Sequence, residues 1–163
     1  MGVHAWTPLG LSRSASSAEV SDWVAQMKSG LSREQLIVEF TKSSEFWTLS
    51  GETNSGFVHR LYTTILNREP DGAGKTYHTE RLDAGESKES VIRDILYSDE
   101  HLSLFISTQY LRLLERSAEP SAIEAWKSRM KSDLNQQGLI KELLLSQEYF
   151  DLSMKKGYER NNK

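Results

Sequence analysis

Residues 72–76, "GAGKT", carry the letters of a phosphate-binding loop. Such a loop has a glycine five positions before the glycine that precedes its lysine, and it follows a buried strand. Here that first position is Glu69, whose carboxylate would repel a phosphate, and the preceding segment "FVHRLYTTILNR" has the apolar spacing of a helix. The motif therefore does not predict a nucleotide site, and we expect no ATP binding through Lys75.

Three arginines, Arg13, Arg68 and Arg116, occupy one position of an internal repeat. A guanidinium at this position can bind an anionic ligand, or it can pair with a carboxylate of the same fold. Two sets of acidic partners are open to it, namely Glu45, Glu100 and Glu148, or Glu39, Asp94 and Glu142. Because a ligand site rarely needs to occur three times, the repetition favours a structural role, and Arg68 stays a candidate anion-binding residue.

A second repeated position holds Trp23, His78 and Trp126. Aromatic faces can stack on sugars and other flat ligands, but these residues lie on apolar helical stripes, which favours a place in the core. The aromatic residues considered as exposed sugar-binding candidates are Trp6, Trp47, Tyr77 and Tyr158. Together with Arg68, the candidate binding residues are Tyr77, His78 and Trp47.

The remaining residue types indicate no catalytic or metal site. The four histidines lack the spacing of a helical ligand set, and the absence of cysteine removes thiol catalysis, disulfides and cysteine-ligated metals. None of the 23 acidic residues forms a distinctive pair. The sequence therefore predicts no catalytic residue, no cofactor and no enzymatic activity of this chain itself.

These residues are positioned by a repeat that is seen when "SREQLIVEFTKSSEF", "SKESVIRDILYSDEH" and "NQQGLIKELLLSQEY" are aligned without a gap. We call the residues at one repeat position a column. One column predicts left-handed helix ends at Gly30 and Gly85. Asp133, which replaces glycine in the third copy, tolerates that conformation less well. Two further columns predict helix N-caps. The N-cap residues are Ser32, Ser87 and Asn135, with Gln35 as a capping-box partner, and then Ser43, Ser98 and Ser146.

Helical stripes fill the segments between the caps. The first stripe is typical of an amphipathic helix, and its residues are Val20, Trp23, Val24 and Met27. The helix after Ser43, Ser98 or Ser146 is expected to run into the next repeat, where Phe57–Arg68 and Phe105–Arg116 share the pattern F-[VI]-x-x-x-Y-x-x-[IL]-L-x-R. The first copy lacks this pattern because Pro8 interrupts it. We therefore expect the chain to begin inside a repeat and to end in a frayed polar tail.

The resulting division has five parts. They are an irregular lead (1–10), a partial first repeat (11–56), a second repeat (57–104), a third repeat (105–150) and a polar C-terminal tail (151–163). At 37% apolar and 26% charged residues the composition is that of a globular protein. The net charge of −3 argues against nucleic acid or an anionic membrane surface as partner. No apolar run reaches the length of a membrane helix, and the first residues lack the pattern of a signal peptide.

The segment "FVHRLYTTILNREPDGAGKTYHTERLDAGESKESVIRDILYSDEH" resembles the bacterial domain-of-unknown-function family 4214, whose pattern is an F-V-x-x-L-Y helix, L-G-R-x-P-D, a tryptophan, a glycine and S-x-E-F. The matching residues are Phe57, Leu61, Tyr62, Leu66, Arg68, Pro70, Asp71, Gly74, Gly85, Ser98 and Glu100. Asn67 stands in place of the usual glycine and His78 in place of the usual tryptophan. Residues 11–46 and 105–150 are weaker copies, and phycobilisome linker domains are distantly similar.

The resemblance implies an all-helical module of the kind appended to exported, surface or carbohydrate-active bacterial proteins, which favours an exported or cell-surface location over the cytoplasm. With the repeat, it leads us to expect an all-α array of two to three tandem helical repeats stacked into one continuous core. The expected function is noncatalytic interaction or assembly, with a protein partner or adjoining domains of one larger protein. The alternative is a carbohydrate-binding module that takes a glycan, and enzymatic activity ranks third.

Overall fold

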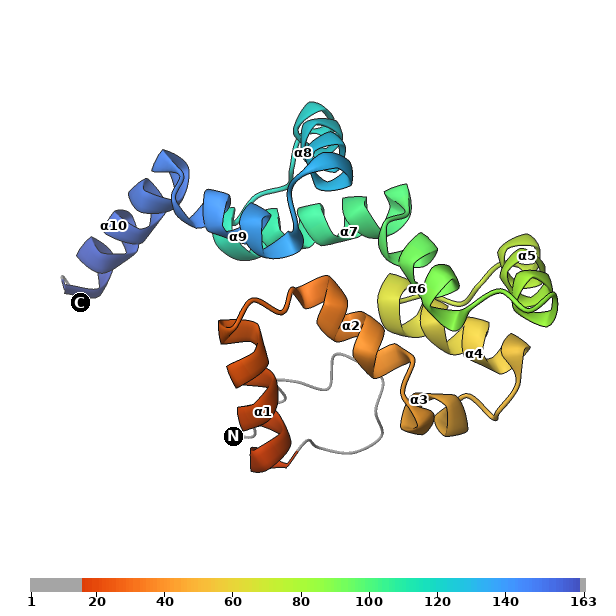
Figure 1. Cartoon of the computed structure of the whole chain (residues 1–163). Helices are drawn as coiled ribbons and strands as arrows, with labels where there is room; N and C mark the ends of the chain where they lie inside the picture. Colours follow the sequence, from red (N-terminus) through yellow and green to blue (C-terminus); the bar gives the residue numbers. More distant parts are fainter. Residues whose placement is uncertain (1–15, 162–163) are drawn as a thin grey trace. The chain divides into compact units, whose positions relative to one another are not determined.

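The computed structural model describes residues 16–161, and the side chains of residues 16–157. Within that range every regular element is a helix (Figure 1), which confirms the all-α prediction. The chain divides into two compact units, Met1–His101 and Leu102–Lys163. Trp6, Arg13 and the side chain of Tyr158 lie outside the described residues.

The repeats are built from three kinds of helix, which we call leading, middle and closing. The middle helices are α1 (Ser17–Lys28), α5 (Gly72–Asp83) and α8 (Pro120–Ser132), and the closing helices are α2 (Arg33–Thr41), α6 (Lys88–Leu96) and α9 (Gln136–Leu144). The leading helices are α4 (Asn54–Leu61) with the π-helical turn η1 (Tyr62–Leu66), and α7 (Asp99–Gln109) with the π-helical turn η2 (Tyr110–Leu114). The short α3 (Ser44–Leu49) and the long α10 (Gln147–Asn161) complete the chain.

The helix N-termini lie where the sequence places them. The side chains of Ser32, Ser87 and Asn135 accept the backbone N–H groups three residues further on, and Gln35 completes a capping box with Ser32. The hydroxyls of Ser43, Ser98 and Ser146 accept in the same way. Since each such cap satisfies an N–H that the helix itself cannot, these polar residues fix where the helices start.

The ends of the middle helices follow the prediction in two copies of three. Gly30 and Gly85 have φ values of 112° and 92°. In both, the next residue donates its N–H back across the end of the helix, from Leu31 to Gln26 O and from Glu86 to Arg81 O. Asp133 instead has φ −141°, so α8 ends without a left-handed residue.

The helix expected to run from one repeat into the next is continuous in only one of the two junctions. α7 passes directly into η2, whereas α3 ends at Leu49 and α4 starts anew at Asn54, after left-handed backbone at Gly51 and Glu52. The reason is spacing, because Phe57 lies fourteen residues after Ser43 but Phe105 lies only seven after Ser98. At the other end, residues 151–161 of the predicted tail belong to α10.

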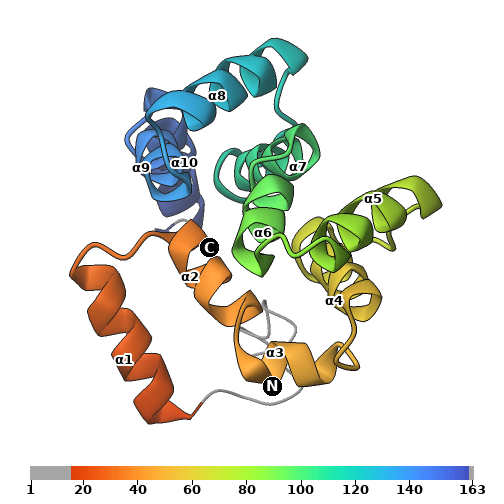
Figure 2. The ribbon, with the colours of Figure 1, turned by 45° about the vertical axis from the view of Figure 1, so that its right-hand side comes forward.

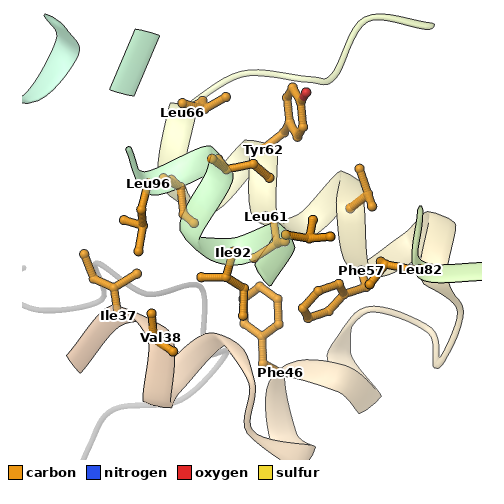
Figure 3. Close-up of a cluster of buried hydrophobic side chains, with 14 residues drawn as sticks. Ile37, Val38, Phe46, Phe57, Leu61, Tyr62, Leu66, Leu82, Ile92 and Leu96 are labelled. Atoms are coloured by element: carbon orange, nitrogen blue, oxygen red, sulfur yellow. The ribbon is translucent and has the colours of Figure 1, made fainter. Parts of the chain in front are cut away.

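Each unit has its own cluster of buried apolar side chains. In the first unit, Phe57 of α4 meets Phe46 of α3 edge to face, with ring centroids 5.7 Å apart, and Ile92 of α6 lies beside them (Figure 3). The second cluster joins Ile106 of α7, Met130 of α8 and other residues of α7–α10. Truncating a fully buried phenylalanine such as Phe57 costs about 3–5 kcal/mol, so these clusters hold the helices in register.

The apolar stripe of α1 was expected to lie in the core, but no residue of this helix is buried. Val20 and Val24 are exposed, and Trp23 is only partly buried, with its ring centroid 4.8 Å from that of Phe40 in α2. The described part of the first unit does not bury this apolar face.

Candidate functional site

The arginine column forms a repeated polar cluster with its own glutamate column. Arg68 donates from Nε to Glu100 Oε1 at 2.5 Å and from Nη2 to Glu100 Oε2 at 2.8 Å. Its Nη1 donates to the carbonyl oxygen of Glu69 at 2.9 Å, and its guanidinium carbon lies 5.1 Å from the ring centroid of Tyr62. A bidentate pair of this kind is geometrically specific as well as charge-assisted.

Arg116 repeats these contacts in the second unit. Its Nε and Nη2 donate to the two carboxylate oxygens of Glu148 at 2.5 and 2.9 Å, and Nη1 donates to the carbonyl oxygen of Ser117 at 3.1 Å. The guanidinium carbon lies 5.2 Å from the ring of Tyr110. We call the sets Tyr62–Arg68–Glu100 and Tyr110–Arg116–Glu148 the arginine clamps.

In the clamps, the guanidinium N–H groups that could bind an anionic ligand already donate to glutamate carboxylates of the same chain. The hydrogen bonds from Arg68 hold the pKa of Glu100 below its usual value, and those from Arg116 do the same to Glu148. Both acids are therefore fully ionised at neutral pH, and an anionic ligand at Arg68 would have to displace a well-placed carboxylate. Arg13 lies outside the described residues, so a third clamp at Glu45 is not described.

The backbone just before each clamp has a shared conformation. Asn67 and Glu115, which follow η1 and η2, both lie in the left-handed region, with φ values of 54° and 55°. This is the column in which the family resemblance expects glycine, the residue that adopts such backbone without strain. The π-helical turn and the left-handed residue together end the leading helix and set the direction in which the arginine leaves it.

A second arginine column was missed from the sequence. Arg81 of α5 donates from Nε and Nη2 to Glu86 at 2.6 and 2.5 Å, and its Nη1 lies 2.5 Å from Asp94 Oδ2. Arg129 of α8 makes two bonds of 2.6 Å to Glu142. Asp94 and Glu142, the alternative partners considered for the first column, thus belong to this second one.

The second column also stacks on aromatic rings and shifts a pKa. The guanidinium carbon of Arg81 lies 5.1 Å from the ring centroid of Tyr77, and that of Arg129 lies 5.0 Å from Trp126. Hydrogen bonds from Arg81, and then from Ser90, lower the pKa of Glu86 to about 2. The signal that could have revealed the column is its fixed distance, since Arg81 and Arg129 each come thirteen residues after a clamp arginine.

In the aromatic column His78 is buried, whereas Trp126 and Trp23 are partly buried. His78 is buried against the rings of Tyr62 and Tyr77, and its Nδ1 has no hydrogen-bond partner among the described residues. Burial lowers the pKa of His78, so the ring is neutral at pH 7. Trp126 is partly buried and donates from Nε1 to the hydroxyl of Tyr110 at 2.8 Å. These side chains support the clamp tyrosines.

The "GAGKT" stretch forms the start of α5, where Asp71 is the N-cap. The Asp71 carboxylate accepts the N–H of Gly74 at 2.8 Å, and this bond is the main reason that the pKa of Asp71 is lowered. An anion at this helix terminus would meet that carboxylate. A Cβ on Gly74 would lie 2.6 Å from the hydroxyl oxygen of Tyr62, so this glycine is explained by packing against a clamp.

The candidate sugar-binding aromatics do not form one surface among the described residues. Trp47 is partly buried against the first cluster, and the ammonium of Lys88 lies 3.3 Å from its ring centroid. Tyr77 is 58% exposed on α5. The structure therefore brings Tyr77 and His78 together beside Arg81, but not Trp47 with either.

A shallow polar depression of about 510 Å³ lies in the first unit. The side chains that give it polarity are those of Thr53, Ser55, His59, Arg60, Thr63 and Lys75. His59 Nε2 lies 3.0 Å from Glu69 Oε2, and Arg60 Nη1 donates to the carbonyl oxygen of Leu49 at 3.1 Å. Across residues 16–161 no group of three or more histidine or acidic side chains is placed to hold a metal ion. No helix of this range is long and apolar enough to cross a membrane.

Comparison with known families gives one match. The model of the domain of unknown function DUF4214 matches residues 9–50 and 38–105, which together cover more than half of the chain. Searches of curated proteins and of solved structures gave no significant match.

Proposed function

Since the chain belongs to the family of the domain of unknown function DUF4214, we propose that it is a noncatalytic helical interaction module that binds another protein. The observation that carries the proposal is the exposed apolar face of α10. Phe150 and Met154 lie one helical turn apart there and are each more than half exposed. Contiguous exposed apolar surface of sufficient area marks a protein-interaction site.

The exposed face of α10 is not the face that packs within the second unit. Tyr149 and Leu152 of α10 pack against the second cluster, so one side of the helix is already anchored. Leu144 and Leu145, where α9 ends, add further exposed apolar surface. Burying a phenylalanine or methionine side chain fully is worth about 1.5–3 kcal/mol. A partner that covered Phe150 and Met154 would gain about half of that from each.

The polar chemistry of the site supports the same proposal. The arginines and acids that converge in the clamps and in the second column are paired with one another at hydrogen-bonding distance. Donors that are already used within the fold in this way are not free to bind a substrate. A carbohydrate-binding module is the alternative, and its support is the exposed ring of Tyr77.

Photo-cross-linking tests the proposal. The photoreactive residue p-benzoylphenylalanine replaces Phe150 in one variant and Tyr77 in a matched control, and both are irradiated in extracts of the native host. We expect protein adducts from position 150 that disappear when Met154→Asp is added, and none from position 77. No adduct from position 150, together with saturable binding of one sugar class by the unmodified chain on a glycan array that Tyr77→Ala removes, would overturn the proposal in favour of the carbohydrate module.

A further inference from the structure

The exposed face of α10 repeats a face that the chain buries elsewhere. Counting from the cap serines Ser98 and Ser146, Phe150 falls in the column of Leu102, and Met154 falls in the column of Ile106. Leu102 and Ile106 of α7 are 1% and 0% exposed, whereas Phe150 and Met154 are 55% and 60% exposed. The column assignment thus makes α10 a leading helix whose apolar face is uncovered.

The covered example shows what such a face packs against. Leu102 and Ile106 belong to the second cluster together with Met130 of α8 and Leu139 of α9. Within the second unit, a leading helix is therefore buried by the middle and closing helices of its own repeat. Figure 2 shows α8, α9 and α10 of this unit.

The first unit contains a middle helix with an uncovered face, namely α1. Val24 of α1 is 44% exposed, whereas Lys127 in the same column of α8 is 8% exposed. Met27 of α1 lies in the column of Leu82 and Met130. Those two residues are buried in the two clusters, but Met27 is only partly buried and belongs to neither.

We propose that the chain assembles head to tail with a second copy of itself, so that α10 of one copy takes the place of a leading helix on α1 of the next. This inference rests on the proposed function and names its partner. The occupant follows from the repeat, because the chain already contains the same helix combination in α4 on α5 and α6 and in α7 on α8 and α9.

The proposed contact has a defined symmetry and strength. The two faces differ, so the interface is heterologous and each copy keeps one free face of each kind, which gives rings or open filaments. Ser153 of α10 stands in the column where α7 buries Phe105. The α10 face is therefore narrower than the face of α7, and we expect an association that dilution reverses.

Complementation between two variants tests the proposal on the full purified chain. Met154→Asp spoils the α10 face, Val24→Asp spoils the α1 face, and both residues are exposed, so neither change disturbs a cluster. We expect the parent chain to grow in mass with concentration in sedimentation velocity, and each variant alone to stay monomeric. An equimolar mixture should give a species of twice the monomer mass and nothing larger. Tyr77→Asp, at an exposed position of α5, is the matched control and should assemble like the parent.

Other outcomes would overturn the inference. A parent chain that stays monomeric at every concentration contradicts self-assembly, and an adduct from position 150 to a different protein would then leave the interaction module standing. A Val24→Asp variant that assembles alone like the parent indicates a symmetric contact between two α10 faces. A parent that assembles while the mixture of variants stays monomeric also contradicts the head-to-tail arrangement. If either variant loses helical circular dichroism, Phe150→Lys and Val20→Lys repeat the test at the neighbouring exposed positions.

Discussion

Replacing the left-handed residue after the second π-helical turn should separate backbone strain from surface charge. Glu115 has φ 55° and pairs through its carboxylate with Lys156. Both Glu115→Ala and Glu115→Gly remove this pair, so its loss cancels when the two variants are compared. Only the glycine variant also removes the Cβ that makes left-handed backbone unfavourable.

The size of the difference follows from two opposing contributions. Left-handed backbone costs a residue with a Cβ about 1–2 kcal/mol. Glycine also has more conformational freedom than alanine in the unfolded chain. This effect lowers the stability of the glycine variant by about 0.4–1 kcal/mol. We therefore expect Glu115→Gly to be more stable than Glu115→Ala by about 0.5–1 kcal/mol.

Urea unfolding monitored by circular dichroism measures this difference, and Asn67 supplies the matched pair in the first unit. Asn67 has φ 54°, and asparagine tolerates left-handed backbone better than glutamate. Asn67→Gly should therefore stay close to the parent, while Asn67→Ala should lose stability. Alanine and glycine variants of equal stability at position 115 would refute the reasoning, because strain at this column would then not contribute to the stability of the fold.

Three further outcomes follow from the site. Arg68→Ala should lower the Tm because it leaves the Glu100 carboxylate without its bidentate partner, and an unchanged Tm with loss of ligand binding would instead indicate an anion site. Lys75→Ala should leave ATP binding undetectable by calorimetry, as in the parent, and binding that vanishes on substitution would restore the phosphate loop. The free energy of unfolding should fall as the pH drops below about 6.5, the ordinary pKa of histidine, because burial lowers the pKa of His78 and His101 and the unfolded chain takes up protons first. Urea titrations at pH 7 and pH 5 check this, and a chain more stable at pH 5 would contradict it.

The starts and ends of several helices were predictable because they depend on contacts between residues that are close in the sequence. Ser32, Ser87 and Asn135 cap helices where the repeat places them, and Gly30 and Gly85 end helices in left-handed backbone. Each of these residues acts on backbone groups within a few positions of itself, so one sequence suffices to read its role.

Features that depend on distant parts of the chain were harder to predict. The stripe of Val20 and Val24 shows which face of α1 is apolar, but whether that face is covered depends on helices elsewhere. The pairing of Arg81 with Asp94 is similar, since the sequence offered several acids to several arginines and only the packing of α5 beside α6 decides between them. Trp47 was considered as an exposed ring because its contact with Lys88 is invisible in the sequence.

The arginine clamps also bear on how such a chain can grow. In both clamps the arginine and its glutamate are 32 residues apart, and the glutamate lies in the first turn of the next leading helix. A genetic duplication that copies the stretch from one arginine to the next therefore copies both partners and the tyrosine that leads into the following clamp. The new segment arrives with its own closing contact and needs no compensating change in its neighbours. Lengthening the array by whole repeats is thus a simpler evolutionary step than altering the interior of any one of them.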